Sequence, residues 1–238
     1  MPDLKRLEWD SDFFEMNVAR IEGAVTCSAD LDQIEKEMST SDIRMAYLFQ
    51  RNMLPKDLKI PNQLEIQQLG SQITYTKPVG SDANIDYQVS PGNWKQDSRT
   101  LTALSIQAGH FSRFRLDPNI TTNKFRDLYK IWIENAIQTD LADQVYVYRV
   151  DQNAVGMISL KQKKDKAIIG LLAVDPVYRG MGIGKTLLNA GEWWAHEQGL
   201  HSLLLITQGD NESACRFYES SDYSVDSRSY VYHFWSKR

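Results

Sequence analysis

Hydrophobic and polar positions in the second half of the chain predict two helices followed by a hairpin. Apolar residues recur at helical spacing in 101–108 and again in 124–137. In 145–150 and 155–160, apolar and polar residues alternate, as they do in half-buried strands. The intervening Asp151-Gln152-Asn153 is a typical hairpin turn sequence, so we expect these two strands to be antiparallel neighbours.

The pattern then continues as strand, helix, strand, helix and strand. Residues 167–174 read A-I-I-G-L-L-A-V, an apolar and β-branched run that predicts a buried strand. Residues 201–207 predict a second buried strand, and 211–218 predict a short helix capped by Asn211. The aromatic-rich segment 223–235 predicts one or two closing strands. This order predicts an α/β protein with a mixed sheet.

The first ninety residues repeat parts of this pattern. Residues 30–38 and 62–69 predict helices, and residues 45–50 and 73–79 predict strands. Turn-rich sequence follows over residues 80–93. We therefore expect an amino-terminal α/β domain over 1–80, a linker over 81–93 and a larger domain over 94–238.

A glycine-rich loop follows the strand at 167–174. Gly180, Gly182 and Gly184 precede a run with helical spacing that includes Leu187 and Trp194, so they lie at a helix amino terminus. Unpaired backbone N–H groups and the helix dipole favour an anion there. Glycine also lets the backbone approach that anion without a Cβ in the way.

Three interpretations of this loop are open. Gly184-Lys185-Thr186 resembles the end of a Walker A motif, but that motif needs a glycine where Arg179 stands, and Gly180 comes one residue too late. A glycine-rich turn without a ligand is a second interpretation. The third is a binding site for a pyrophosphate, built on the spacing Arg-x-x-Gly-x-Gly.

Two motifs, Arg-x-x-Gly-x-Gly at 179–184 and Asn-x-x-Ala-x-x-Phe-Tyr at 211–218, resemble those of the GCN5-related N-acetyltransferase (GNAT) family. The resemblance implies the GNAT fold and acetyl-CoA as cosubstrate. It also implies that Asn211 hydrogen-bonds the pantetheine arm. The residues it assigns to acetyl-CoA binding are Leu172, Ala173, Val174, Arg179, Gly180, Met181, Gly182, Ile183, Gly184, Lys185, Thr186, Asn211, Ala214 and Phe217.

Acetyl transfer to an amine requires an oxyanion to be stabilised, a proton to leave the amine and a proton to reach the departing thiolate. A phenol, with a reference pKa of about 10, is suited to that last step. The resemblance places Tyr218 beside the thioester sulfur, so we expect it to be the general acid. The alternative role for Tyr218 is packing on the sheet. No histidine or carboxylate is marked as the base, and an ordered water is an equal candidate.

The acceptor is suggested by a second resemblance. Residues 7–14, 110–118 and 124–137 resemble the bacterial dTDP-fucosamine acetyltransferases, which act on the 4-amino group of a dTDP-linked 4-amino-4,6-dideoxygalactose. We expect Arg113, Phe114 and Glu134 to contact such a nucleotide sugar. Arg113 and Arg115 are suited to pairing with its diphosphate, and Glu134 to orienting the amine or relaying its proton. The alternative for these three charged residues is a solvated position on the surface. Under this resemblance, the first ninety residues are a partial copy of the same topology without a glycine loop, and they enclose the acceptor site. A protein amino terminus, a polyamine or another small amine is an alternative acceptor, and a non-catalytic CoA-binding module is an alternative of another class.

Charge, cysteine and histidine spacing and hydrophobic segments indicate which partners, metals and cellular location to expect. A net charge of −4 over 238 residues gives no basic face for nucleic acid. The amino terminus lacks a signal peptide and no segment is apolar enough to span a membrane, so we expect a cytoplasmic protein. Cys27, Cys215 and the four histidines fit no metal spacing, and we predict no metal. The alternating aromatic residues of 230–235 are suited to pairing across a homodimer.

Overall fold

The computed structural model describes residues 2–80 and 84–237, so part of the expected linker, residues 81–83, lies outside the described residues. The first part of the chain contains six elements. They are β1 (Asp3–Arg6), α1 (Glu8–Phe14), β2 (Asn17–Glu22), α2 (Ser28–Thr40), β3 (Ile43–Gln50) and β4 (Leu64–Pro78).

The second part contains the remaining elements. They are β5 (Val89–Pro91), α3 (Trp94–Ala108), α4 (Arg113–Leu116), α5 (Thr122–Gln138), β6 (Gln144–Val150), β7 (Asn153–Lys163), β8 (Lys166–Val174), a 3-10 turn (Pro176–Tyr178), α6 (Ile183–Glu197), β9 (Ser202–Gln208), α7 (Glu212–Glu219) and β10 (Ser224–Ser236). The model confirms the expected mixed α/β architecture. Strand β5 lies within the segment expected to be a linker and pairs with β6.

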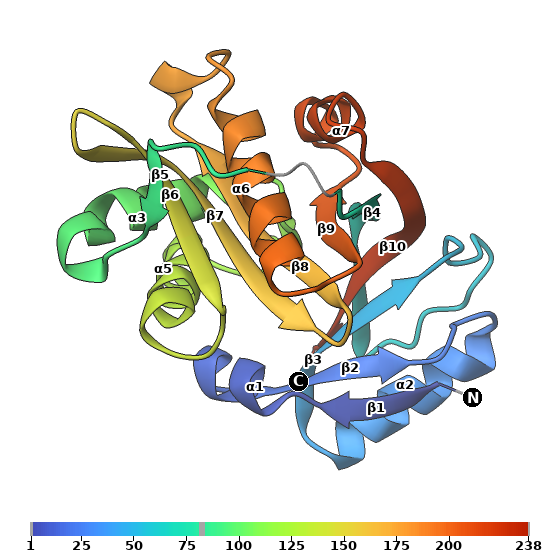
Figure 1. The fold of residues 1–238 in the computed structure, drawn as a ribbon. Helices are drawn as coiled ribbons and strands as arrows, with labels where there is room; N and C mark the ends of the chain where they lie inside the picture. The colour runs from blue at the N-terminus through green and yellow to red at the C-terminus, as the bar shows by residue number, and fades with distance from the viewer. Residues whose placement is uncertain (1, 81–83, 238) are drawn as a thin grey trace.

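All strands of the described chain join one mixed sheet in the order β1-β2-β3-β10-β4-β9-β8-β7-β6-β5 (Figure 1). Two of these strands cross between the parts of the chain. The last strand of the first part, β4, lies between β9 and β10, and the last strand of the chain, β10, lies between β3 and β4. The two parts therefore share a continuous backbone hydrogen-bond network.

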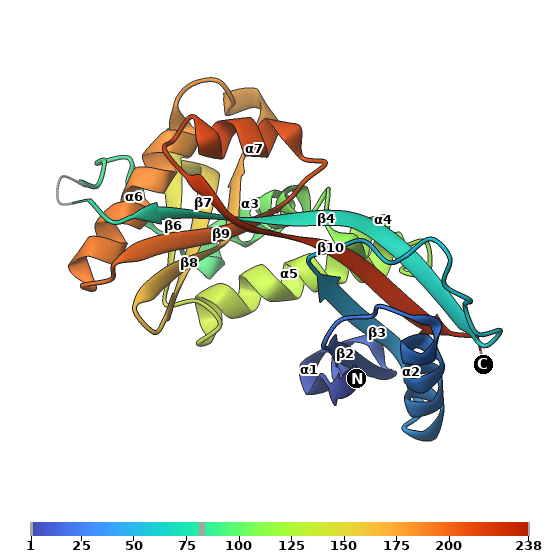
Figure 2. The same ribbon diagram turned by 90° about the vertical axis from the view of Figure 1, so that its right-hand side faces the viewer.

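Helices cover both faces of the sheet. Buried residues of α6 and α7 pack with one face, including Leu187 and Tyr218, whereas Leu101 of α3 and Ile133 of α5 pack with the other. Figure 2 shows α7 above and α5 below the long strands β4 and β10. No helix in the described part of the chain is long and apolar enough to cross a membrane.

Strand β3 separates two cores because its side chains alternate between the faces of the sheet. Ala46 and Leu48 pack with helix α2. Met45 and Tyr47 point to the opposite side and pack with Phe114 and the aromatic residues around it. This places β3, from the first part of the chain, against α4 and α5 of the second part.

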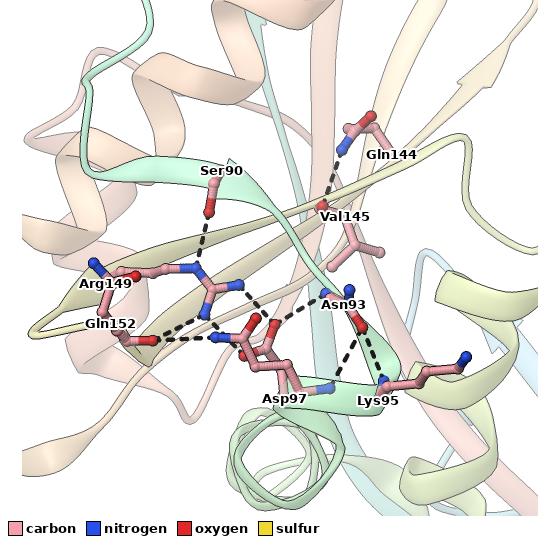
Figure 3. Close-up of polar contacts among 9 residues, drawn as sticks. Ser90, Asn93, Lys95, Asp97, Gln144, Val145, Arg149 and Gln152 are labelled. Carbon is pink, nitrogen blue, oxygen red and sulfur yellow. Dashed lines mark hydrogen bonds and ion pairs between the residues drawn. The ribbon is translucent and has the colours of Figure 1, made fainter.

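A polar cluster fixes the beginning of α3 (Figure 3). Asn93 caps the helix by accepting the backbone N–H of Lys95 at 3.0 Å, and Asp97 accepts the backbone N–H of Asn93 at 2.9 Å. The Asp97 carboxylate also binds both terminal nitrogens of Arg149, at 2.9 and 2.8 Å. Bidentate pairs of this kind are strong and directional. They tie α3, whose other end reaches the candidate site, to the β6–β7 hairpin.

Two expectations from the sequence are wrong. Residues 62–69 do not form a helix, because residues 64–68 pair with β10, as residues 71–76 of the same strand also do. Leu64 and Ile66 lie two residues apart, as same-face residues of a strand do. Residues 230–235 do not offer an edge for a homodimer, because each of them pairs with β3 on one side and most also pair with β4 on the other.

Candidate functional site

The site begins where β8 and β9 separate. These parallel strands pair from Lys166 to Ile169, and the pairing ends at Ile169 opposite Leu205. At this point β8 carries a bulge, with the N–H of Leu171 donating to the Ser159 hydroxyl at 2.8 Å. Beyond the bulge, 170–174 and 206–208 are unpaired with each other, which opens a gap in the middle of the sheet.

A cleft of about 1110 Å³ occupies this gap and extends to α4 and α5. Most of the residues expected to bind the cosubstrate or the acceptor line it. The residues expected from the sequence that line the cleft are Leu172, Ala173, Val174, Arg179, Gly180, Gly182, Ile183, Gly184, Lys185, Asn211, Ala214, Phe217, Tyr218, Arg113 and Phe114. Met181, Thr186 and Glu134 are not among the lining residues.

The glycine loop has the backbone geometry that its sequence implies. Gly180 and Gly182 have φ of 78° and 81°, in the left-handed region that other residues rarely adopt. Gly182 is the residue before α6, so the first N–H groups of that helix face the cleft without partners in the preceding turn. Gly184 allows α6 to pack closely against Phe217 of α7, since a Cβ at this position would lie 3.0 Å from the Phe217 ring. The loop therefore presents a concave set of N–H groups suited to a phosphate.

The end of β8 is held by two side chains. The carbonyl oxygen of Val174 accepts hydrogen bonds from Gln107 Nε2 at 2.8 Å and Arg179 Nε at 3.2 Å. Gln107 comes from the end of α3 that is opposite the Asp97 cluster. On the other side of the cleft, Asn211 caps α7 by accepting the N–H of Ala214 at 3.2 Å. Its side-chain NH₂ group is the donor that this cap leaves available.

Tyr218 lies on α7 at the cleft. It is 8% exposed, and its ring packs against Tyr75 and Tyr223 at centroid distances of 5.8 and 6.1 Å. Burial, and to a lesser extent the charge of Cys215, raises the pKa of Tyr218 well above its ordinary value. The phenol is therefore neutral and carries its proton across the physiological pH range.

The other end of the cleft is aromatic and carries one arginine. Arg113 lies with its guanidinium carbon 4.0 Å from the Phe114 ring centroid and 4.6 Å from that of Tyr47. Phe111, Tyr129 and Trp132 also line this end. Phe114 itself is 1% exposed and belongs mainly to the core beneath Arg113.

Glu134 and Arg115 lie away from this arrangement. Glu134 is half-buried on α5 and accepts a hydrogen bond from Gln138 at 3.4 Å, one turn along the same helix. Arg115 is exposed and does not line the cleft. The model therefore brings Arg113 to the cleft but neither of the other two charged residues considered for the acceptor.

The family comparison agrees with this geometry. Residues 112–223 match the model of the acetyltransferase (GNAT) family. The chain carries a GNAT acetyltransferase domain. The matched segment contains the separated strands, the glycine loop and α7, which together form most of the cleft.

The similarity of this acetyltransferase to other proteins extends beyond the matched segment. The dTDP-fucosamine acetyltransferase of Escherichia coli O6:H1 is 27% identical over 229 residues, covering 95% of this chain and 96% of that protein. The spore coat polysaccharide biosynthesis protein SpsD of Bacillus subtilis is 24% identical over 139 residues, covering 58% of this chain and 48% of that protein. A crystal structure of a putative GNAT acetyltransferase from Novosphingobium aromaticivorans has a TM-score of 0.53 at 16% identity, covering 82% of this chain and 75% of that chain, and it supports the fold.

An acetyl-CoA cosubstrate fits the residues present in the acetyltransferase. The concave N–H groups at the start of α6 suit a pyrophosphate, and the separated edges of β8 and β9 suit an extended arm with amide groups. Within the described residues, no cluster of three or more His, Cys, Asp or Glu side chains is arranged to hold a metal ion.

Several cleft residues were missed from the sequence. Gln107 and His110, at the end of α3, line the cleft, as do Gln72 of β4 and Thr207 of β9. Gln107, Gln72 and Thr207 lie in no recognisable motif, and His110 begins the segment 110–118 but was not singled out within it. Gln72 reaches the cleft only because β4 pairs with β9, with Gln72 opposite Gln208, and nothing in the sequence marks that pairing.

Proposed function

We propose that this acetyltransferase transfers the acetyl group of acetyl-CoA to the amine of a nucleotide-linked amino sugar. The observation that carries the proposal is the continuous cleft, which joins the α6 glycine loop and Tyr218 to Arg113 and its aromatic surroundings. A cation beside planar rings is suited to a phosphate group joined to a nucleoside. The likeness to the E. coli dTDP-fucosamine acetyltransferase over nearly the whole of both chains supports the same class of acceptor.

The chain's own residues divide the work along this cleft. The N–H groups of Ile183 and Gly184 bind the pyrophosphate of the cosubstrate, while backbone N–H groups near 172–174 face the acetyl carbonyl. Tyr218, whose phenol is protonated at neutral pH, donates its proton to the departing thiolate as the carbon–sulfur bond breaks. Arg113 binds the diphosphate of the acceptor, and a water removes the proton from the amine.

The test is thiol release from acetyl-CoA with a panel of amines. The panel contains dTDP-4-amino-4,6-dideoxygalactose, the same amino sugar without the nucleotide, spermidine and a short peptide. We expect the highest kcat/KM with the dTDP-linked sugar. A preference for spermidine or the peptide would assign another acceptor, and absence of thiol release with every amine would favour a non-catalytic CoA-binding module.

A further inference from the structure

Arg113 is a cation without an acidic partner at ion-pair distance. No carboxylate of the described chain lies within 4.0 Å of its guanidinium, whereas Arg6, Arg149 and Arg216 have such partners. Instead, the guanidinium carbon lies over the rings of Tyr47, Phe49 and Phe114, at 4.6, 5.2 and 4.0 Å from their centroids. Its Nε atom is buried and has no hydrogen-bond partner in the protein. Buried polar atoms are usually paired, so Nε is an unsatisfied donor, and it belongs to a side chain that also lines the cleft.

Three of the residues that shape this environment, Asp10, Tyr47 and Phe49, come from the first part of the chain. Tyr47 lies on β3, where it pairs with His233 of β10, and its phenol donates a hydrogen bond to Asp10 of α1 at 3.2 Å. That bond fixes the phenol, and the aromatic ring of Tyr47 in turn supports the Arg113 guanidinium. Asp10 influences Arg113 electrostatically without forming an ion pair with it.

The remaining groups against Arg113 do not neutralise it. His233 packs on Tyr47 at a centroid distance of 4.7 Å, and its Nδ1 binds Asp117. Burial lowers the pKa of His233 to about 4, so the imidazole is neutral at physiological pH. Tyr129, on the other side, is also a neutral phenol whose pKa burial raises. Arg113 therefore presents positive charge to the cleft.

We propose that Tyr47 and Asp10 are positioning residues that hold Arg113 in the orientation that binds a phosphate-type anion of the acceptor. This inference rests on the proposed function, because it assigns the acceptor an anionic group. It also gives the first part of the chain a specific task in acceptor binding. Asp10 orients Tyr47, Tyr47 orients Arg113, and Arg113 contacts the anion.

The kinetic test compares a charged with an uncharged acceptor. Tyr47→Phe keeps the ring but removes the hydroxyl, which bonds to Asp10 and also interacts with Arg113. Arg113→Gln removes the cation. We expect Tyr47→Phe to raise KM for the dTDP-linked amino sugar about tenfold and Arg113→Gln about a hundredfold, since bonds to charged groups are among the stronger ones. The KM of the sugar without the nucleotide, and the Kd of CoA, should change less than twofold.

A double variant separates positioning from general damage to the fold. If Tyr47 acts through Arg113, Tyr47→Phe should have no further effect on KM in the Arg113→Gln background. Tyr232→Phe is a matched control, because its phenol accepts the N–H of Leu54 in another core and lies outside the cleft. Additive effects of Tyr47→Phe and Arg113→Gln, or an equal rise of KM for both acceptors, would overturn the proposal.

A binding measurement keeps this inference distinct from the proposed function. CoA-saturated protein is titrated with dTDP and with inorganic pyrophosphate by calorimetry, and Tyr47→Phe and Arg113→Gln should weaken both. If the wild-type protein acetylates the dTDP-linked sugar but neither variant changes the affinity for dTDP or pyrophosphate, the inference is refuted and the proposed function stands. Arg113-dependent and Tyr47-dependent binding of pyrophosphate without turnover of any nucleotide sugar would support the inference and refute the function. Absence of binding of either anion would refute the inference.

Discussion

At the scale of single residues, Tyr218 is the group whose chemistry is easiest to isolate. Its neighbour Tyr223 provides a comparison, because both phenols are buried, but Tyr218 lines the cleft whereas Tyr223 does not. The Tyr223 hydroxyl also has no hydrogen-bond partner. A tyrosine-to-phenylalanine substitution can therefore be made at two neighbouring buried rings. Only the Tyr218 hydroxyl takes part in the proposed reaction.

We expect Tyr218→Phe to lower kcat by about 10²- to 10⁴-fold, the usual contribution of a general acid. The Kd of CoA should stay near the wild-type value, because the ring that packs on the sheet is retained. Tyr223→Phe should leave kcat nearly unchanged. Steady-state kinetics and calorimetry measure both quantities, and an unchanged kcat for Tyr218→Phe, when chemistry limits the rate, would remove this phenol from the mechanism.

The raised pKa of Tyr218 also predicts the pH dependence. An acid must be protonated to act, and burial shifts the loss of the Tyr218 proton to higher pH than the ordinary value of about 10. We therefore expect kcat of the wild-type enzyme to show no fall between about pH 8 and 10 from loss of this proton. A descending limb in that range that disappears in Tyr218→Phe would show that the phenol ionises there.

At the scale of elements, α6 has glycines of similar conformation at its two ends. Gly182 before the helix has φ of 81° and lines the cleft, and Gly199 after it has φ of 66° and lies outside the cleft. A Cβ at either position would meet no atom within 4 Å. The two sites thus carry comparable backbone strain on substitution and differ in their relation to the phosphate-binding N–H groups.

We expect Gly182→Glu to weaken CoA binding by at least about tenfold, because a carboxylate would stand beside the pyrophosphate site and compete for the same dipole. Gly199→Glu should lower thermal stability by a similar amount and leave CoA affinity intact. Calorimetric titration with CoA and thermal melts test the pair. Equal losses of affinity in both variants would mean that strain, and not position, causes the effect.

The elements also show what the sequence can predict. The glycine loop and α7 could be predicted because each depends on a few adjacent residues. The loop needs its glycines at fixed spacing, and α7 begins at the capping residue Asn211. Strand β4 was predicted in part as a helix because its pairing with β10 joins segments more than 140 residues apart. Tyr47 and Asp10 escaped notice for the same reason, since they meet Arg113 only after β3 joins the sheet beside β10. Sites made of adjacent residues can therefore be predicted from the sequence, whereas contacts between distant strands depend on the topology of the sheet.

At the scale of the whole molecule, the exchange of β4 and β10 makes the two parts of the chain interdependent. Strand β4 supplies β9 and β10 with a hydrogen-bonded neighbour, and Gln72 on β4 lines the cleft. Without residues 1–80, the backbone edges of β9 and β10 would be left unpaired, and long unpaired edges promote aggregation. The expected division into domains at 1–80 and 94–238 therefore does not imply that either part folds alone.

We expect residues 84–238 produced alone to be aggregated or inactive, and co-production with residues 1–80 to restore a soluble complex that releases thiol from acetyl-CoA. The cut falls between β4 and β5, so it breaks no strand pairing of the described sheet. Size-exclusion chromatography and the thiol assay measure the outcome. In a matched control, residues 1–80 carrying Thr74→Pro should fail to complement, because proline cannot donate the backbone hydrogen bonds that join β4 to its neighbours. A monomeric, active 84–238 fragment would show instead that the larger part is an independent domain and that β4 is dispensable to its sheet.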